Sequence, residues 1–273
     1  MKRSNRLVAM TNYFLTNPYQ LIRLSHFSEK YASSKSSISE DLDIINDMFK
    51  LEGIGYLRRL SGASGGVMYV PFYSKNKADQ FTAHLCHMLE DSHRILPGGY
   101  LYMSDILGDP KLMRKIGHIF ASAFSKLNID VVMTVATKGI SLAYAVAYHL
   151  NVPVVIVRRD PKVTEGSSVS INYVSGSSRK IQTMVLPKRS LEEGSNVCLI
   201  DDFMKAGGTV NGMKSMLEEF NANLQAIGVL AEADDEEDER VINNYMSLVK
   251  ITNVDIQNQY IKVHPGNYEK WFT

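Results

Sequence analysis

Cysteine is scarce in this chain. Of 273 residues only two are cysteines, Cys86 and Cys198, and they lie far apart in the sequence. Such a pair cannot form a disulfide framework, and no zinc-ligand spacing accompanies it. The composition therefore excludes a small disulfide-stapled secreted protein and suits the reducing cytoplasm.

Neither positive nor negative charge is in marked excess. The chain has 30 Lys and Arg residues against 29 Asp and Glu residues, and its formal net charge is +1. This balance excludes a globally basic nucleic-acid coat. It leaves room for a local basic patch.

Long hydrophobic runs are absent as well. The one long uncharged stretch covers residues 139–157, and His149, Asn151 and Pro153 divide it into a helix-like half and a β-branched half. Residues 1–6 are basic like the start of a signal peptide, but no apolar stretch of sufficient length follows them. We therefore expect no membrane-spanning segment and a cytoplasmic location.

The overall composition is that of a soluble globular protein, with 45% hydrophobic and 22% charged residues. The length is about twice that of a usual single domain. Because the sequence pattern changes near residue 74, we predict two domains, residues 1–73 and residues 74–273.

The N-terminal region contains three amphipathic helix patterns. A capping-box pattern at residues 37–40 places the start of the third helix within Ser34 to Ser37, and glycines at 53 and 55 end it. Two short strands, residues 56–60 and 67–70, flank a glycine-rich turn. Three helices followed by a hairpin is the order of a winged helix-turn-helix, whose third helix reads DNA. The apolar residues that mark one face of each helix are Leu7, Met10, Phe14; Leu24, Phe27, Tyr31; and Ile38, Leu42, Ile45, Phe49.

Positive charge is concentrated in this region, where residues 1–74 hold nine Lys and Arg and six Asp and Glu. DNA is held mostly through its phosphates, so we expect contacts from a basic N-terminal arm, from the start of the third helix and from the hairpin. A generic α+β cap is the alternative, and Asp41 and Asp43, on the expected polar side of the third helix, count against a phosphate-facing surface there. The predicted DNA-binding residues are Lys2, Arg3, Arg6, Ser34, Lys35, Ser36, Ser37, Arg58 and Arg59.

From residue 76 onward, helices alternate with apolar strands. Helical patterns cover residues 76–91 and 109–127, and apolar strand-like runs cover residues 131–136, 152–157, 197–200 and 227–231. This alternation is typical of a parallel sheet buried on both faces, so we predict a doubly wound α/β domain. Ligand sites in that fold lie just beyond the carboxyl ends of the strands.

The strongest chemical signal lies at residues 197–209. An apolar strand runs into Asp201 and Asp202, and a small loop with Gly207 and Gly208 leads to Thr209 at the start of a helix. Adjacent carboxylates accept hydrogen bonds from vicinal hydroxyls, and the glycines let backbone N–H groups approach a phosphate at the helix N-terminus. The pattern predicts a site for a ribose phosphate, with an ordinary tight turn between strand and helix as the alternative.

This segment resembles the phosphoribosyl pyrophosphate signature of type I phosphoribosyltransferases. Together with the N-terminal winged helix and residues 95–100, 134–140 and 164–167, it makes the whole chain similar to the purine repressors of Gram-positive bacteria. The resemblance covers essentially the full length. It implies a winged helix-turn-helix domain followed by a type I phosphoribosyltransferase fold with a central parallel sheet.

The resemblance also implies roles for residues at the strand ends. In the family, acids that match Asp201 and Asp202 bind the ribose hydroxyls, residues that match 205–209 hold the 5′-phosphate, and a loop that matches 136–139 holds the pyrophosphate. That loop often includes a non-proline cis peptide. Residues 163–181, rich in serine, are expected to form a flap that orders over a ligand. Tyr102 is explained equally well as an ordinary sheet tyrosine. The predicted effector-binding residues are Tyr102, Ala136, Thr137, Lys138, Gly139, Arg158, Arg159, Lys162, Asp201, Asp202, Phe203, Met204, Lys205, Ala206, Gly207, Gly208 and Thr209.

The sequence contains no recognisable catalytic triad, metal-ligand spacing or purine-recognition cluster, so we predict no catalytic residue and no metal site. The resemblance implies a homodimeric transcriptional repressor of purine biosynthesis and related genes that binds double-stranded operator DNA. Phosphoribosyl pyrophosphate, with Mg²⁺ as a possible companion, is expected to lower its DNA affinity. Two alternatives stay open: an active purine phosphoribosyltransferase with an accessory N-terminal domain, and the same repressor with a purine nucleotide as competing effector or corepressor.

Overall fold

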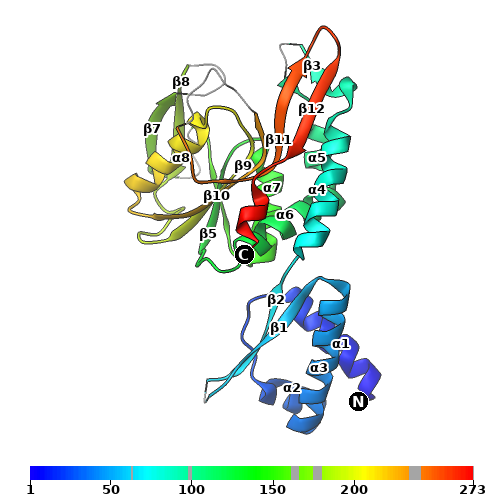
Figure 1. The fold of residues 1–273 in the computed structure, drawn as a ribbon. Coiled ribbons are helices and arrows are strands. Elements are labelled where there is room, and N and C mark those ends of the chain that lie inside the picture. Colours follow the sequence, from blue (N-terminus) through cyan, green and yellow to red (C-terminus); the bar gives the residue numbers. More distant parts are fainter. Residues whose placement is uncertain (63, 98–99, 161–165, 175–179, 234–240, 273) are drawn as a thin grey trace. The chain divides into compact units, whose positions relative to one another are not determined.

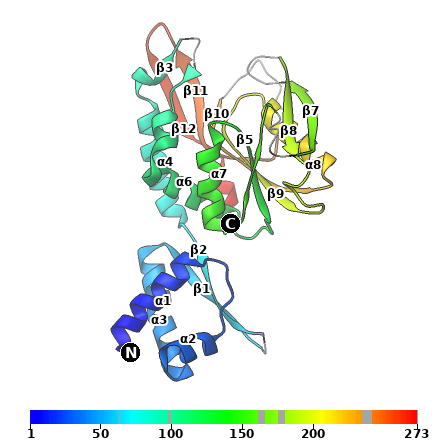
Figure 2. The same cartoon turned by 180° about the vertical axis from the view of Figure 1, so that it is seen from behind.

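The computed structural model describes residues 1–62, 64–97, 100–160, 166–174, 180–233 and 241–272 (Figures 1 and 2). The chain divides into two compact units. The N-terminal unit consists of Met1–Ser74 with His149–Asn151, and the C-terminal unit consists of Lys75–Tyr148 with Val152–Thr273. Within the described ranges, no helix is long and apolar enough to cross a bilayer.

The N-terminal unit has the predicted order of three helices and a hairpin, which confirms a winged helix-turn-helix. Its core is built from the apolar helix faces that the periodicity predicted, with Phe14, Phe27 and Leu42 fully buried at the centre. The two strands pair antiparallel. The elements are α1 (Arg3–Thr16), α2 (Leu24–Tyr31), α3 (Lys35–Glu52), β1 (Gly55–Leu60) and β2 (Gly66–Pro71).

Helix α3 starts and stops at its capping residues. The Ser34 side chain accepts a hydrogen bond of 3.2 Å from the backbone N–H of Ser37, and Gly53 ends the helix with a left-handed φ of 58°. The start lies within the predicted window, but the N-cap is Ser34 and not the serine at 37. A single antiparallel backbone bridge also pairs Ile22 with Val67 of β2, and no sequence pattern indicates it.

The C-terminal unit is α/β. After α4 (Lys75–Leu89) and the 3-10 helix η1 (Ser92–Arg94), the chain forms a small hairpin, and it ends in the 3-10 helix η3 (Tyr268–Trp271). The remaining elements are β3 (Ile95–Leu96), β4 (Tyr100–Leu101), α5 (Ser104–Gly108), α6 (Pro110–Ala123), β5 (Val131–Val135), α7 (Gly139–Leu150), β6 (Val154–Val157), β7 (Ser168–Val174), β8 (Ile181–Pro187), β9 (Asn196–Met204), α8 (Gly208–Glu219), β10 (Asn223–Ala233), β11 (Met246–Asp255) and β12 (Tyr260–Pro265).

The central sheet has six strands in the order β12-β11-β10-β9-β5-β6. All neighbouring pairs are parallel except β11 and β12, which are antiparallel at one edge (Figure 1). The predicted parallel sheet is confirmed by strands β5, β6, β9 and β10. Strands β11 and β12 were not predicted from the sequence.

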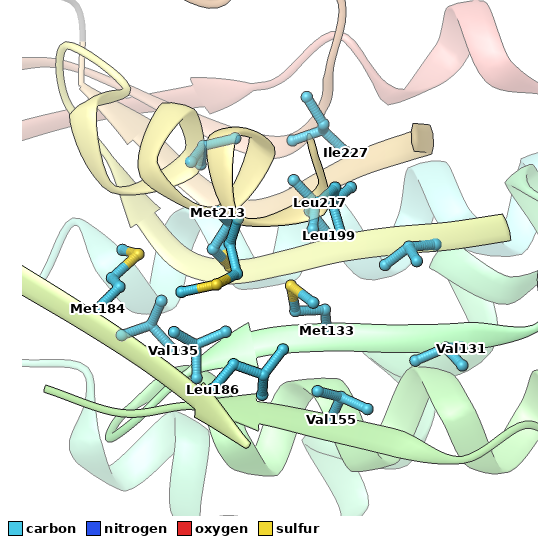
Figure 3. Close-up of a cluster of buried hydrophobic side chains, with 14 of the residues drawn as sticks. Val131, Met133, Val135, Val155, Met184, Leu186, Leu199, Met213, Leu217 and Ile227 are labelled. Carbon is cyan, nitrogen blue, oxygen red and sulfur yellow. The ribbon is translucent and has the colours of Figure 1, made fainter. Parts of the chain in front are cut away.

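Both faces of this sheet are covered. On one face, Leu199 of β9 and Ile227 of β10 pack with Met213 and Leu217 of α8 (Figure 3). On the other face, a side-chain carbon added to Gly228 would lie 2.8 Å from the ring of Phe120 on α6. Because successive strand residues point to opposite faces, continuous apolar runs in β9 and β10 serve both layers, which is the doubly wound arrangement.

The described part of the predicted flap falls mainly on strand β7, which pairs with β8. Strands β7 and β8 pair antiparallel, and residue 185 of β8 bridges to residue 158 at the end of β6. The expectation of a flap is wrong for Ser168–Val174, because Tyr173 is buried there and Val169 and Ile171 pack on the core beside α8. Residues 163–165 and 175–179 of the predicted flap lie outside the described residues.

Candidate functional site

A cavity of about 480 Å³ opens at the carboxyl ends of β5, β6 and β9. A smaller hollow of about 70 Å³ adjoins it, formed by residues 203–210 with Asp201, and shares Asp201, Phe203 and Thr209 with the cavity. We call the smaller hollow the cradle. The sequence placed a ligand at these strand ends, and the structure brings the segments 135–138, 158–160 and 201–209 together there. The residues that line the cavity are Val135, Ala136, Thr137, Lys138, Arg158, Arg159, Asp160, Asp201, Asp202, Phe203 and Thr209.

The two acids are held side by side by strand β9. The strand continues to Met204, so Asp201 and Asp202 lie in its last four residues and not in a loop. The N–H of Asp202 donates to Oδ1 of Asp201 over 3.0 Å. Asp201 is almost fully buried, and Asp202 is partly buried.

Burial, reinforced by the charge of Asp202, raises the pKa of Asp201 well above its ordinary value. Burial also raises the pKa of Asp202, while a hydrogen bond with Asp201 and the positive charge of Lys138 oppose that rise. Two carboxylates whose charges are disfavoured in this way gain from any ligand that donates hydrogen bonds to them. A vicinal diol is such a ligand, because each hydroxyl offers a donor at the right spacing.

Three cations also line the cavity. Lys138 follows strand β5, and Arg158 and Arg159 follow strand β6. The peptide bond between Ala136 and Thr137 is cis, in agreement with the loop geometry that the resemblance implies. Paired guanidinium and ammonium groups beside exposed backbone are the groups that bind a pyrophosphate.

Glycine is required where β5, α7 and β9 meet. A side-chain carbon added to Gly139 would lie 2.5 Å from Oγ1 of Thr134 and 3.4 Å from Oδ1 of Asp201. A side chain at this position would clash with Thr134 and come into van der Waals contact with Asp201. Its absence lets the start of α7 pack closely against β5 and β9.

Gly207 shapes the cradle. It adopts a φ of 86°, which side chains disfavour, and it directly precedes the first residue of α8, Gly208. Because Gly207 has no side chain to cap the helix, the first N–H groups of α8 are available to an anion. The size and chemistry of the cradle fit a single phosphate group.

Most predicted effector residues lie around the cavity or the cradle, with Met204, Lys205, Ala206 and the two glycines lining the latter. Tyr102 does not line either one; it follows the β3–β4 hairpin outside the central sheet and is 42% exposed. Lys162 lies outside the described residues. Sequence reasoning missed Asp160, although its place directly after two strand-end arginines was a signal.

A second candidate site lies on the N-terminal unit. A groove of about 420 Å³ runs between the starts of α2 and α3 and the hairpin. The structure brings the predicted Lys35 and Arg59 together in it. The residues that line it are Arg23, Leu24, Ser25, Lys35, Arg59, Leu60, Ser61, Gly62, Gly65 and Gly66.

The basic arm expected at the N-terminus is absent, because α1 already begins at Arg3. Arg6 is buried and donates from Nε to the Asp41 carboxylate and from Nη1 to Ser33 Oγ, the latter over 2.7 Å. Arg3 pairs with the same carboxylate over 2.8 Å. The prediction of Arg6 as a phosphate contact is therefore wrong: its guanidinium neutralises Asp41, which is fully buried and does not lie on a polar helix face.

The other predicted DNA contacts remain on the surface. Ser34 Oγ lies 2.9 Å from the hydroxyls of both Ser36 and Ser37 at the exposed start of α3. Arg59 is half-exposed and bonds to Asp43 over 2.7 Å, which ties the hairpin to α3. Lys2, Lys35 and Arg58 are exposed.

The family model described as "Bacterial purine repressor, N-terminal" matches residues 2–71, and that of the phosphoribosyl transferase domain matches residues 103–265. The chain is 57% identical over 271 residues to the purine biosynthesis transcriptional repressor PurR of Bacillus subtilis, covering 99% of this chain and 95% of that protein. The chain belongs to the bacterial purine repressor family.

Within the purine repressor family, direction of regulation differs between named relatives. The purine biosynthesis transcriptional activator PurR of Lactococcus lactis is 46% identical to this chain over 267 residues, and the match covers 98% of both chains.

The structure of adenine phosphoribosyltransferase from Thermoanaerobacter pseudethanolicus matches 61% of this chain and 98% of its own, with a TM-score of 0.52 and 20% identity. That likeness shows the fold of the C-terminal unit. A purine repressor family member thus carries a transferase-like fold behind a DNA-binding unit.

Proposed function

We propose that this protein is a transcriptional repressor of purine biosynthesis genes, that it binds operator DNA through its N-terminal unit, and that phosphoribosyl pyrophosphate lowers its DNA affinity. The observation that carries the effector assignment is the cavity on the C-terminal unit. It joins a phosphate-sized cradle, two carboxylates suited to a diol and three cations suited to a pyrophosphate. A phosphate, a diol and a pyrophosphate are the three parts of phosphoribosyl pyrophosphate. Mg²⁺ is proposed to accompany its pyrophosphate.

Regulation, and not catalysis, is supported by the family. The relatives matched over nearly the whole chain are named as transcriptional regulators. A ligand regulates only through a difference in its affinity for the DNA-bound and DNA-free forms. We propose a homodimer, because winged-helix proteins usually read paired half-sites with two copies.

Fluorescence anisotropy of a labelled duplex from upstream of a purine biosynthesis operon tests this function. The protein is titrated with and without phosphoribosyl pyrophosphate and Mg²⁺, with a scrambled duplex as control. We expect sequence-selective binding that the effector weakens. If only purine nucleotides changed the selective binding, the protein would still be a repressor, but its effector would be a nucleotide. Nucleotide formation from a purine base and phosphoribosyl pyrophosphate would favour the transferase alternative.

Lys35→Ala is expected to weaken operator binding and to lower the slope of log affinity against log salt by about one. Lys35 lies in the groove at the start of α3, where a phosphate contact releases one counterion. The slope is measured by anisotropy over a series of KCl concentrations. Lys50→Ala is the matched control, because that exposed lysine lies in the last turn of the same helix. An unchanged slope for Lys35→Ala would remove this residue from the DNA interface.

A further inference from the structure

A chain of hydrogen bonds begins at the cradle. The N–H of Val241 donates to the carbonyl oxygen of Ala206 over 3.2 Å. Next to it, the buried Ile242 lies against the cradle, since a carbon added to Gly207 would be 3.3 Å from its Cγ1. Three residues further on, the hydroxyl of Tyr245 donates to the carboxylate of Glu232. The segment 241–245 thus contacts the cradle at one end and Glu232 at the other.

Glu232 is the centre of the chain. It lies on β10, is 4% exposed and pairs in register with Met204 of the cradle. Besides the Tyr245 hydroxyl, its carboxylate accepts a hydrogen bond of 2.6 Å from Ser247 Oγ. A buried carboxylate needs such donors, so any movement of Tyr245 or of β10 must be followed by Ser247.

Asn267 continues the chain from Ser247. Its N–H donates to Ser247 Oγ over 3.1 Å, and its Oδ1 accepts from the N–H of Ser247 over 2.9 Å. Its Nδ2 also donates to the carbonyl oxygen of Tyr245 over 2.9 Å. Three hydrogen bonds from one residue fix the start of η3 to β11 and to the segment that contacts the cradle.

Tyr268 carries the hydrogen-bond chain to α4. It is 1% exposed, and its hydroxyl donates to Oδ1 of Asp79 over 2.8 Å. The other oxygen of Asp79 pairs with Nζ of Lys75 over 3.0 Å. Lys75 is the first residue of α4 and directly follows Ser74, where the N-terminal unit ends. The chain therefore leads from the cradle to the covalent connection between the units.

We propose that this hydrogen-bond chain, from Ala206 through Glu232, Ser247, Asn267 and Tyr268 to Lys75, transmits occupancy of the cradle to the start of α4 and so lowers DNA affinity. The proposal rests on the proposed function, because it takes phosphoribosyl pyrophosphate as the ligand and operator release as the response. An anion that orders residues 205–208 pulls on the Ala206 carbonyl. The bonds in series then reposition Asp79 and the first turn of α4. Tyr268 and Ser247 act as positioning residues, since neither touches the ligand.

Tyr268→Phe tests the chain, since it removes one hydroxyl and keeps the buried ring. The full-length protein is titrated with operator DNA, with and without phosphoribosyl pyrophosphate and Mg²⁺, and effector binding is measured separately by calorimetry. We expect effector affinity and effector-free DNA affinity within about twofold of wild type. The ratio of DNA affinities without and with effector is expected to fall by about fivefold or more.

Tyr173→Phe is the matched control. Tyr173 is a buried tyrosine of the same unit, and its hydroxyl donates to Gln182 over 2.8 Å outside the chain. Its variant is expected to keep the wild-type ratio. Ser247→Ala breaks the chain at another point, and the double variant Tyr268→Phe with Ser247→Ala is expected to lose no more coupling than either single change. Bonds in series fail together, whereas independent stabilising contacts would add.

The outcomes separate this proposal from the function on which it rests. Wild-type protein that binds the operator but ignores the effector overturns the effector assignment itself. Wild-type protein that responds, with Tyr268→Phe and Ser247→Ala responding equally, overturns only the hydrogen-bond chain. Loss of response in Tyr173→Phe as well would mean that general loosening of the unit, and not this chain, sets the coupling.

Discussion

Replacing Asp202 by lysine is expected to abolish the response to phosphoribosyl pyrophosphate while leaving operator binding intact. The aspartate lies beside Lys138 at the end of β9, and a lysine in its place would repel that cation and offer no acceptor to the ribose hydroxyls. Hydrogen bonds to a charged group contribute about 1.5–3 kcal/mol each. Loss of two therefore weakens effector binding by about 100-fold or more.

The measurement is effector affinity by calorimetry together with operator binding by anisotropy. Asp160→Asn is the matched control, because Asp160 lines the same cavity at the end of β6 but lies outside the acidic pair. It is expected to change effector affinity by a few-fold at most. An Asp202→Lys variant that still releases the operator at the wild-type effector concentration would show that the ribose is not bound by this pair.

Asp41→Ala is expected to destabilise the N-terminal unit by about 3–5 kcal/mol, which is a large share of the stability of so small a unit. The substitution leaves the Arg6 guanidinium buried without its carboxylate partner. The bond from Arg6 to Ser33 also holds the turn before α3, so operator binding is expected to fail as well. The C-terminal unit has its own core and is expected to keep effector affinity.

Calorimetric unfolding of a control variant distinguishes loss of the buried ion pair from the loss of any ion pair on this helix. Asp43→Ala removes an ion pair with Arg59 on the same helix, but both of those side chains are exposed, so a loss of about 0–1 kcal/mol is expected. Equal melting temperatures of the two variants would show that the buried ion pair contributes no more to stability than the surface ion pair.

The same buried pair predicts a dependence on pH. Burial alone would raise the pKa of Asp41, but hydrogen bonds from Arg6 and Arg3 outweigh it and lower the pKa below its ordinary value. A carboxyl with a depressed folded pKa stabilises the fold above its unfolded pKa and loses that contribution as the pH falls toward the folded pKa. The melting temperature of the N-terminal unit is therefore expected to fall below about pH 4 more steeply in wild type than in Asp41→Asn. Parallel curves would contradict the depressed pKa.

Much of the fold follows from patterns that are local in the chain. The spacing of Ile38, Leu42 and Ile45 sets the buried face of α3, and the runs at β5, β6, β9 and β10 belong to a sheet covered on both faces. The acidic pair and the glycine loop at residues 201–209 predict the cavity, because the order of strand, acids, glycines and helix is contiguous.

Most predictions that were wrong or missing concern residues whose position depends on distant segments of the chain. The arm expected to hold Arg6 is a helix whose arginine meets Asp41, 35 residues away. Tyr102, placed in the site by resemblance, follows a hairpin outside the central sheet. Strand β11 lacks a clean alternation of polar and apolar residues, because it is buried mainly in its first half. Strand β12 does alternate, with Ile261 and Val263 buried between exposed neighbours, and this signal was missed.

The sequence by itself determined the class of both units and the strand ends where the cavity lies, and it predicted ribose phosphate chemistry for that site, since each of these depends on neighbours in the chain. Only the tertiary structure decided which charges are buried, how closely Gly139 packs against Thr134 and Asp201, and that hydrogen bonds and short backbone segments join the cradle to Lys75. These features depend on burial and on contacts between residues far apart in sequence. Periodicity predicts which apolar face is buried, but it does not show which charged side chains are buried or which distant residues they contact, because those partners are set by packing.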